Sequence, residues 1–233
     1  TLAPTITTIG LTSSTGGLVS ASDATVNNLN AGDALSATVT FNDVITVNTS
    51  GGTPYLTLNV GGTSVQAAYV SGSGSNALVF TATVASGHND INGVAIGADA
   101  LKLNGGTLKD ASGNNSTLTS VAVTDNAHYL VDTTRPTAVV SSSTSALISG
   151  QTATITFTFS EDPGSTFTWN GSVGDVTLVN GTLSAIIGTG LTRTATFFPT
   201  QGLTGGSASI TVNNDLFTDS AGNLGVGNSL GSL

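Results

Sequence analysis

The chain has 233 residues, with 13 acidic and 4 basic side chains and a net charge of −9. Charged residues make up 7% of it, against roughly 25% in an average soluble domain. This balance excludes nucleic acids and anionic membrane surfaces as partners, because both attract clustered Lys and Arg. Cysteine is absent, so there are no disulfides and no thiol chemistry, and no apolar run is long enough to span a membrane.

Apolar and polar residues alternate with period two along most of the chain, which is the pattern of half-buried β-strands. Gly-rich stretches and four Asn-Gly pairs lie between these segments and favour tight hairpin turns. Short strands with a turn every ten residues or so predict antiparallel β-sandwiches, with almost no helix. The predicted strands cover residues 34–41, 55–60, 64–70, 77–84, 152–159, 193–198 and 207–212.

Three short sequence landmarks recur in the same order in the two halves of the chain. Their offsets are 109, 118 and 132 residues, so the halves are related domains whose loops differ in length. We predict two tandem sandwiches, residues 1–131 and 132–233, with a linker at about 131–137. The paired landmarks are KDASGN (109–114) with TDSAGN (218–223), FND (41–43) with FSED (159–162), and APT (3–5) with RPT (135–137).

The linker has the sequence VDTTRPT and contains Arg135, one of only four basic residues. Pro136 fixes its own φ and pushes Arg135 towards extended geometry. A linker of Gly and Ser would let the domains tumble, whereas this one predicts a short, stiff joint.

Several acidic residues are predicted to meet beside this linker. In a seven-stranded sandwich, the loop after the second strand and the loop before the last strand lie at the pole where the chain enters. Glu161 and Asp162 follow the second strand of the second domain, and Asp219 precedes its last strand. We therefore expect Glu161, Asp162 and Asp219 to converge beside Asp132 of the linker.

Such a cluster favours calcium, which takes six to eight oxygen ligands in loose geometry. Without a cation the carboxylates would repel one another, and some would protonate. The alternative is that they are solvated loop acids with no ligand role. The remaining candidate ligands are Asp90, in the loop GHNDING that faces the same junction, and the turn carbonyls of Thr134 or Asn223.

The strings VDTTRPT, TATITFTFSED, TRTATFFPT and FTDSAGN resemble the bacterial Ig-like repeats of very large secreted adhesins, of the RTX and biofilm-associated type. YVSGSGSNALVFTATV and LKDASGN in the first half are similar to another such repeat. The resemblance implies extracellular, non-catalytic extender repeats that support adhesion and biofilm formation, stiffened by calcium at their joints. It implies Asp132, Glu161 and Asp219 as ligands. FND lacks the Glu of FSED, so a matching site near Asp43 and Asp110 stays open.

Enzymatic function is not expected. His88 and His128 are the only histidines, and no strand pattern places either beside a serine. Glu161 and Asp219 could form a glycosidase carboxylate pair, but such enzymes have clefts lined by aromatic residues, which make up 5% of this chain. The alternative to a spacer is a carbohydrate- or surface-binding module. It would expose Phe167 and Trp169, which share one face of a segment and which we expect in the core instead.

The expected partners are neighbouring repeats of the same chain. Every sandwich has edge strands that could pair with another copy. Here the net negative charge, the turns and the short strands would prevent this, since edge lysines are nearly absent. We therefore expect a monomer.

Overall fold

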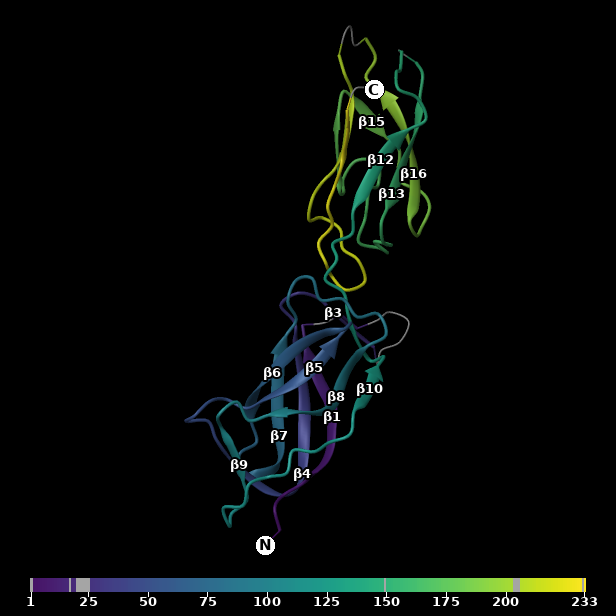
Figure 1. Cartoon of the computed structure of the whole chain (residues 1–233). Coiled ribbons are helices and arrows are strands. Elements are labelled where there is room, and N and C mark those ends of the chain that lie inside the picture. Colours follow the sequence, from purple (N-terminus) through teal and green to yellow (C-terminus); the bar gives the residue numbers. More distant parts are fainter. Residues whose placement is uncertain (1, 17, 20–25, 149, 203–205, 232) are drawn as a thin grey trace. The chain divides into compact units, whose positions relative to one another are not determined.

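We describe a computed structural model of the protein for residues 2–16, 18–19, 26–148, 150–202, 206–231 and 233. Within these residues, strands and turns build the chain (Figure 1), and no helix is long and apolar enough to cross a membrane. All strand pairs in the described part of the chain but one are antiparallel, so the predicted all-β class is confirmed. The chain divides into two compact units, Thr1–Thr133 and Thr134–Leu233, which we take in turn.

The strands of the first unit follow the alternation of the sequence. Leu35, Ala37, Val39 and Phe41 in β4 are buried, and the residues between them are partly exposed. The four strands predicted in this unit are all present. Its strands are β1 (Ile6–Thr15), β2 (Leu18–Val19), β3 (Asn27–Leu29), β4 (Ala34–Asn48), β5 (Tyr55–Val60), β6 (Thr63–Ser71), β7 (Ser75–Thr83), β8 (Val94–Lys102), β9 (Thr107–Lys109), β10 (Val123–Asn126) and β11 (Tyr129–Val131).

One large sheet dominates the first unit, in the order β1-β4-β7-β6-β5-β8-β10, with β9 pairing to the far end of β4. Strand β6 pairs with both β7 and β5, so the two expected layers are continuous through the β5–β6 hairpin. Gly61 and Gly62, with φ of 54° and 89°, form the two-residue turn of this hairpin. A two-residue turn with positive φ at both central positions matches the right-handed twist of the flanking strands.

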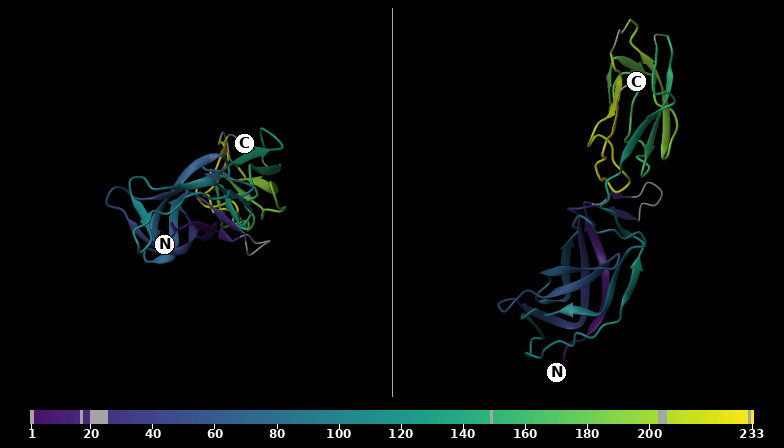
Figure 2. Two further views of the ribbon diagram at one scale, coloured as in Figure 1. Left: turned by 60° about the horizontal axis from the view of Figure 1, so that its bottom comes forward. Right: turned by 45° about the horizontal axis from the view of Figure 1, so that its top comes forward.

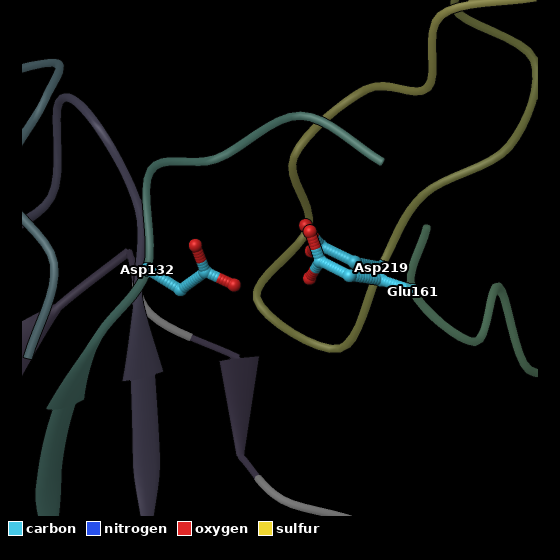
Figure 3. Close-up of side chains that lie close together, drawn as sticks. All are labelled: Asp132, Glu161 and Asp219. Carbon is cyan, nitrogen blue, oxygen red and sulfur yellow. The ribbon is translucent and has the colours of Figure 1, made fainter. Parts of the chain in front are cut away.

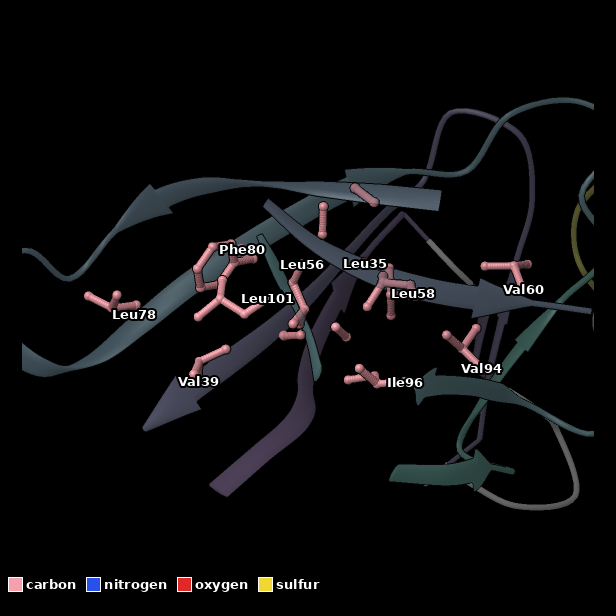
Figure 4. Packing of buried hydrophobic residues seen from close by; sticks show 14 of the residues in the cluster. Leu35, Val39, Leu56, Leu58, Val60, Leu78, Phe80, Val94, Ile96 and Leu101 are labelled. Carbon is pink, nitrogen blue, oxygen red and sulfur yellow. The ribbon is translucent and has the colours of Figure 1, made fainter. Parts of the chain in front are cut away.

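Buried side chains, most of them from the strands of this sheet, form the core of the first unit. Leu58 and Phe80 are fully buried, and Figure 4 shows their side chains among those of neighbouring strands. Tyr69 meets Phe80 edge-on, with ring centroids 5.9 Å apart. Burial of these side chains contributes most of the stabilisation, at about 1.5–3 kcal/mol for each large apolar residue.

The second unit is a sandwich of two separate sheets (Figures 1 and 2), β12-β13-β16-β15 and β14-β17-β18. With the strands lettered A to G along the chain, these are sheets ABED and CFG. This is the order of a constant-type immunoglobulin sandwich. The strands are β12 (Ala138–Ser142), β13 (Ala153–Phe159), β14 (Val176–Val179), β15 (Gly181–Leu183), β16 (Thr192–Pro199), β17 (Ser209–Val212) and β18 (Ser229–Gly231).

Phenylalanine rings fill one end of this sandwich. Phe159 and Phe167 meet edge-on with ring centroids 4.8 Å apart, and both also contact the fully buried Phe217. Edge-to-face pairs of this kind contribute about 0.5–1.5 kcal/mol beyond the area they bury. Phe167 is thus a core residue, as expected, whereas Trp169 is only partly buried.

The two units begin in the same way. The carbonyl of Pro4 accepts the amide of Thr117 at 2.7 Å, and the carbonyl of Pro136 accepts the amide of Val226 at 2.8 Å. The residue after each proline then donates its amide to the side chain next to an equivalent phenylalanine, Phe41 within β4 or Phe159 at the end of β13. These bonds are Thr5 to Asn42 Oδ1 and Thr137 to Ser160 Oγ, at 2.9 and 2.8 Å. The sequence landmarks are therefore structural equivalents.

Replacing Gly225 by alanine tests the packing of Phe217. A Cβ at Gly225 would lie 2.2 Å from a carbon of the buried Phe217 ring, so the ring would have to move. We expect Gly225→Ala to lower the free energy of unfolding by about 1–3 kcal/mol. Trp169, the sole tryptophan, lies in this unit, so its emission during urea unfolding measures the effect.

Gly231→Ala is the matched control, because a Cβ there meets nothing within 4 Å. It should change the stability by less than about 1 kcal/mol. Equal losses in the two variants would contradict the packing described for Phe217.

Candidate metal site

Three carboxylates that the sequence analysis predicted to converge do lie together. Asp132 directly follows β11, Glu161 lies two residues after β13, and Asp219 lies in the turn before β18. One carboxylate oxygen from each lies within 4.8 Å of the others, and Figure 3 shows the three side chains grouped. Asp219 is buried, and the other two are partly exposed.

Asp219 is held by the turn that it begins. Its Oδ1 accepts the amides of Ala221 and Asn223, at 2.8 and 3.0 Å, and its Oδ2 accepts the side-chain amide of Asn223 at 2.9 Å. Gly222, with a φ of 86°, closes the turn. Because a carboxylate has about four lone-pair sites, these three bonds orient the group and leave it able to bind a cation as well.

The first unit contains the same turn at Asp110. Its Oδ1 accepts the amides of Ser112 and Asn114, at 2.9 and 2.8 Å, and its Oδ2 accepts the side-chain amide of Asn114 at 2.7 Å. This side-chain hydrogen bond from Asn114 holds the pKa of the Asp110 carboxyl below its ordinary value, although burial opposes the effect. The pattern Asp-x-x-Gly-Asn is therefore a structural device in its own right, whether or not a cation is bound.

Asp132 is fixed through its backbone. Its amide donates to the carbonyl of Leu29 at 2.9 Å, and Val131 before it exchanges two hydrogen bonds with Asp90, at 2.6 and 2.9 Å. The amide of Thr133 donates to Asn89 Oδ1 at 2.7 Å. The residues around the Asp132 carboxylate are thus tied to the loop 87–93 and to the end of β3.

Asp90 was a predicted ligand, but within the described residues it is not a member of the three-carboxylate group. It is 4% exposed, and its two oxygens accept the amides of Gly61 and Gly93, at 2.7 and 2.9 Å. These bonds close the β5–β6 turn and the turn at Asn92-Gly93. The placement of Asp90 supports a structural role.

The two carbonyl ligands predicted from the sequence, those of Thr134 and Asn223, are close along the chain to Asp132 and Asp219. The carbonyl of Asn223 accepts the amide of Asp219 at 3.3 Å, so it already closes the turn. Thr134 is the first residue of the second unit, two positions after Asp132. Their roles as ligands stay predictions. Asp162 was also expected to join the cluster, but it pairs with Arg193 at 3.3 Å and is outside the group within the described residues.

The geometry of the group suits a calcium ion. Calcium binds oxygen at 2.3–2.6 Å, so two ligands on opposite sides of one ion are up to about 5 Å apart. Three carboxylate oxygens within 4.8 Å of one another can therefore share one ion. Three negative charges at this spacing would otherwise repel, and a divalent cation offsets that repulsion.

Arg193 is a residue of this region that the sequence analysis missed. It is 6% exposed and lies on the buried face of β16 with Ala195 and Phe197. The signal was available in RTATFF, because period-two alternation puts position 193 in phase with these two core residues. A charged side chain in that phase needs buried partners.

Residues 132–232 match the family model described as bacterial Ig-like domain. The matched stretch covers the second unit and includes all three grouped acids. A search of curated proteins found no match to the chain. The second unit is thus similar to bacterial Ig-like domains in sequence, and its strand order is that of an immunoglobulin sandwich.

The Asp110 turn should make the first unit sensitive to acid. A carboxyl whose pKa is lower in the folded state contributes stability above its ordinary pKa, and this is lost as the pH falls through the folded value. Asp110→Asn should therefore reduce stability at pH 7, and the difference should shrink below about pH 4. All three tyrosines lie in the first unit, so tyrosine near-UV circular dichroism during urea unfolding reports on it.

Asn114→Ala keeps the carboxylate but removes the amide that lowers its pKa. It should flatten the pH dependence of stability between about pH 2 and 6, within about two pH units of the pKa of an ordinary Asp, which is about 3.9. A difference between wild type and Asp110→Asn that is the same at pH 7 and pH 3 would contradict this assignment.

Proposed function

We propose that the chain is a pair of non-catalytic spacer domains from a large extracellular bacterial adhesin, which projects a binding tip and supports adhesion and biofilm formation. The match of residues 132–232 to bacterial Ig-like domains and the ABED/CFG sandwich support a structural module. The equivalent start of the first unit supports a repeated one. In this proposal the chain is monomeric, and its partners are neighbouring repeats.

A spacer needs a linker that resists bending, and the hydrogen bonds of the linker residues support this property. Thr133 is bound to Asn89 in the first unit. Arg135 is bound to the carbonyl of Leu224 in the second, at 2.7 Å from Nε. Only residue 134 lies between them, and Pro136 restricts the backbone further. Few backbone torsions remain to bend the linker.

Calcium at the three-carboxylate group completes the proposed mechanism, and the grouping of these acids is the observation that carries it. An ion held by Asp132, Glu161 and Asp219 would tie the linker to the two loops that bear the other acids. Without the ion, repulsion among the carboxylates would loosen the linker while each core stays folded. Extracellular sites of this kind can be weak, with a Kd of about 10⁻⁴–10⁻³ M.

Calcium should therefore raise the melting temperature and lengthen the average particle seen by small-angle scattering, and a chelator should reverse both. Binding to the folded state alone adds about 2.7 kcal/mol at a hundredfold excess over Kd. Asp132→Asn and Glu161→Gln should each abolish the response and leave both units folded. Calorimetry in calcium and in chelator measures the first effect.

Asp125→Asn is the control for charge, because it removes one exposed carboxylate outside the group. It should keep the calcium response of the wild type. Melting and scattering that are the same in calcium and in chelator would refute the site.

One observation favours the alternative, a carbohydrate-binding module. Trp169 is partly exposed and lines an open groove of about 560 Å³ with Val173, Thr177 and Thr182. None of the residues that line this groove is charged. Its mixed apolar and hydroxyl lining could accept a neutral sugar ring against the indole.

Emission from Trp169 separates the two functions. The spacer proposal expects no change on adding millimolar cellohexaose or maltohexaose, because the indole packs against the core and its Nε1 bonds to the carbonyl of Leu183 at 3.4 Å. A saturable shift that disappears in Thr182→Val would favour the binding module. Trp169 is the sole tryptophan, so the signal has one source.

A further inference from the structure

The only two arginines of the chain, Arg135 and Arg193, both lie in the second unit. Each bonds main-chain carbonyls in one of the two loops that bear the grouped acids of that unit. We propose that both are positioning residues, which fix the loops of Glu161 and Asp219 so that the carboxylates are in place before a cation binds. This inference rests on the proposed calcium site.

Arg193 holds the loop that follows β13. Its Nη1 donates to the carbonyl of Phe167 at 3.0 Å, and its Nη2 donates to the carbonyl of Gly164 at 2.6 Å. The same Nη2 pairs with Asp162, the neighbour of Glu161. One buried guanidinium therefore bonds three points between residues 162 and 167.

The surroundings show that this placement of Arg193 is costly. Its guanidinium carbon lies 5.8 Å from the ring centres of Phe159 and Phe167, and its Nε is buried with no hydrogen-bond partner in the described residues. The rings offset part of the cost by cation–π attraction. A buried charge with an unsatisfied donor lowers stability relative to an apolar side chain of similar size. A role other than stability explains why the loop is bonded in this way.

Arg135 holds the other loop. Its Nε and Nη2 donate to the carbonyls of Leu224 and Gly225, at 2.7 and 3.1 Å, directly after the Asp219 turn. It also pairs with Asp215, but both side chains are about half exposed, so this ion pair contributes little. The two carbonyl bonds connect the linker to the segment that continues from Asn223.

The first unit has uncharged residues at the positions equivalent to the two arginines. Arg193 pairs with Phe157 across β13 and β16, and Leu78 pairs with Val39 at the same register of β4 and β7. Leu78 is fully buried. Ala3 precedes Pro4 as Arg135 precedes Pro136. The related unit thus uses leucine and alanine, and it also lacks the Glu of FSED, since the matching sequence FND has Asp43, which lies within β4.

Fixing the loops in advance favours ion binding, because the conformational entropy of the loops is then lost when the protein folds and not when the ion binds. Residues that orient metal ligands by hydrogen bonds contribute about 10–100-fold to metal affinity. The direction in which the calcium affinity changes separates positioning from a simple effect of charge. A nearby positive charge repels calcium, so removing it should tighten binding if charge alone mattered. Loss of positioning should weaken binding instead.

The test uses the residues of the first unit as replacements, Arg193→Leu and Arg135→Ala, alone and together, in the full chain. Calcium titration by calorimetry should show about tenfold weaker binding or more for each variant. The losses should multiply in the double variant, because the two loops are bonded separately. Lys102→Ala removes a positive charge from the first unit and should bind calcium as the wild type does.

Amide hydrogen exchange in chelator gives a readout that needs no ion. Arg193→Leu should speed exchange at residues 162–167, and Arg135→Ala at residues 220–225, while exchange in the β13 and β16 ladders stays slow. If wild type binds no calcium, the proposed function fails, and the exchange data alone then decide whether the arginines fix the loops. Unchanged or tighter calcium binding in the variants, or unchanged exchange in the loops, would overturn the inference.

Discussion

In each unit, one backbone hydrogen bond joins the proline at the start of the unit to a segment near its end, and this tie constrains the arrangement of the rest of the unit. In the second unit the carbonyl of Pro136 accepts the amide of Val226, and Val226 in turn accepts the amide of Ala138. This clamps the first strand beside the segment that leads into the last one. The loop after β13 is fixed to the same place, because the amide of Ser160 donates to the carbonyl of Thr137 at 2.9 Å. The grouping of Glu161 and Asp219 follows from these bonds.

The sparse charges of the chain are concentrated where the backbone needs a partner. Asp90, Asp110 and Asp219 each accept two or more N–H groups at a turn. Asp175 is similar, since its Oδ2 accepts the amide of Thr168 at 2.6 Å, although burial raises the pKa of its carboxyl. Threonine and serine supply polarity elsewhere, as in the Ser36–Thr81 and Thr12–Thr38 contacts across strands. Charge in this protein mostly serves local geometry.

Much of this organisation could be predicted from the sequence, because period-two alternation and the repeated landmarks report directly on strands and on loop order. Strand order predicted the convergence of Asp132, Glu161 and Asp219, but it also placed Asp162 there, and Asp162 pairs with Arg193 instead. Other features could not be predicted in this way. Strand β8 was missed because its register with β5 shifts between the pairs Leu101–Leu56 and Ile96–Leu58. The residues between these pairs include Asp99, with a φ of 52°, and they break the alternation of apolar and polar residues. The alternation of RTATFF places Arg193 on the core face, but its bonds to the carbonyls of Gly164 and Phe167 could not be predicted from the sequence.

The tie at Pro136 also has a mechanical consequence. Thr137 and Val226 pair in parallel, as Thr5 and Thr117 do in the first unit. When the two ends of such a unit are pulled apart, two parallel segments slide past each other along their common axis. Their hydrogen bonds then share the load in shear, whereas an antiparallel hairpin pulled from its open end would break its bonds one after another. The parallel pair at the start of each unit therefore has the geometry that resists stretching, and it lies at the point where force enters the unit.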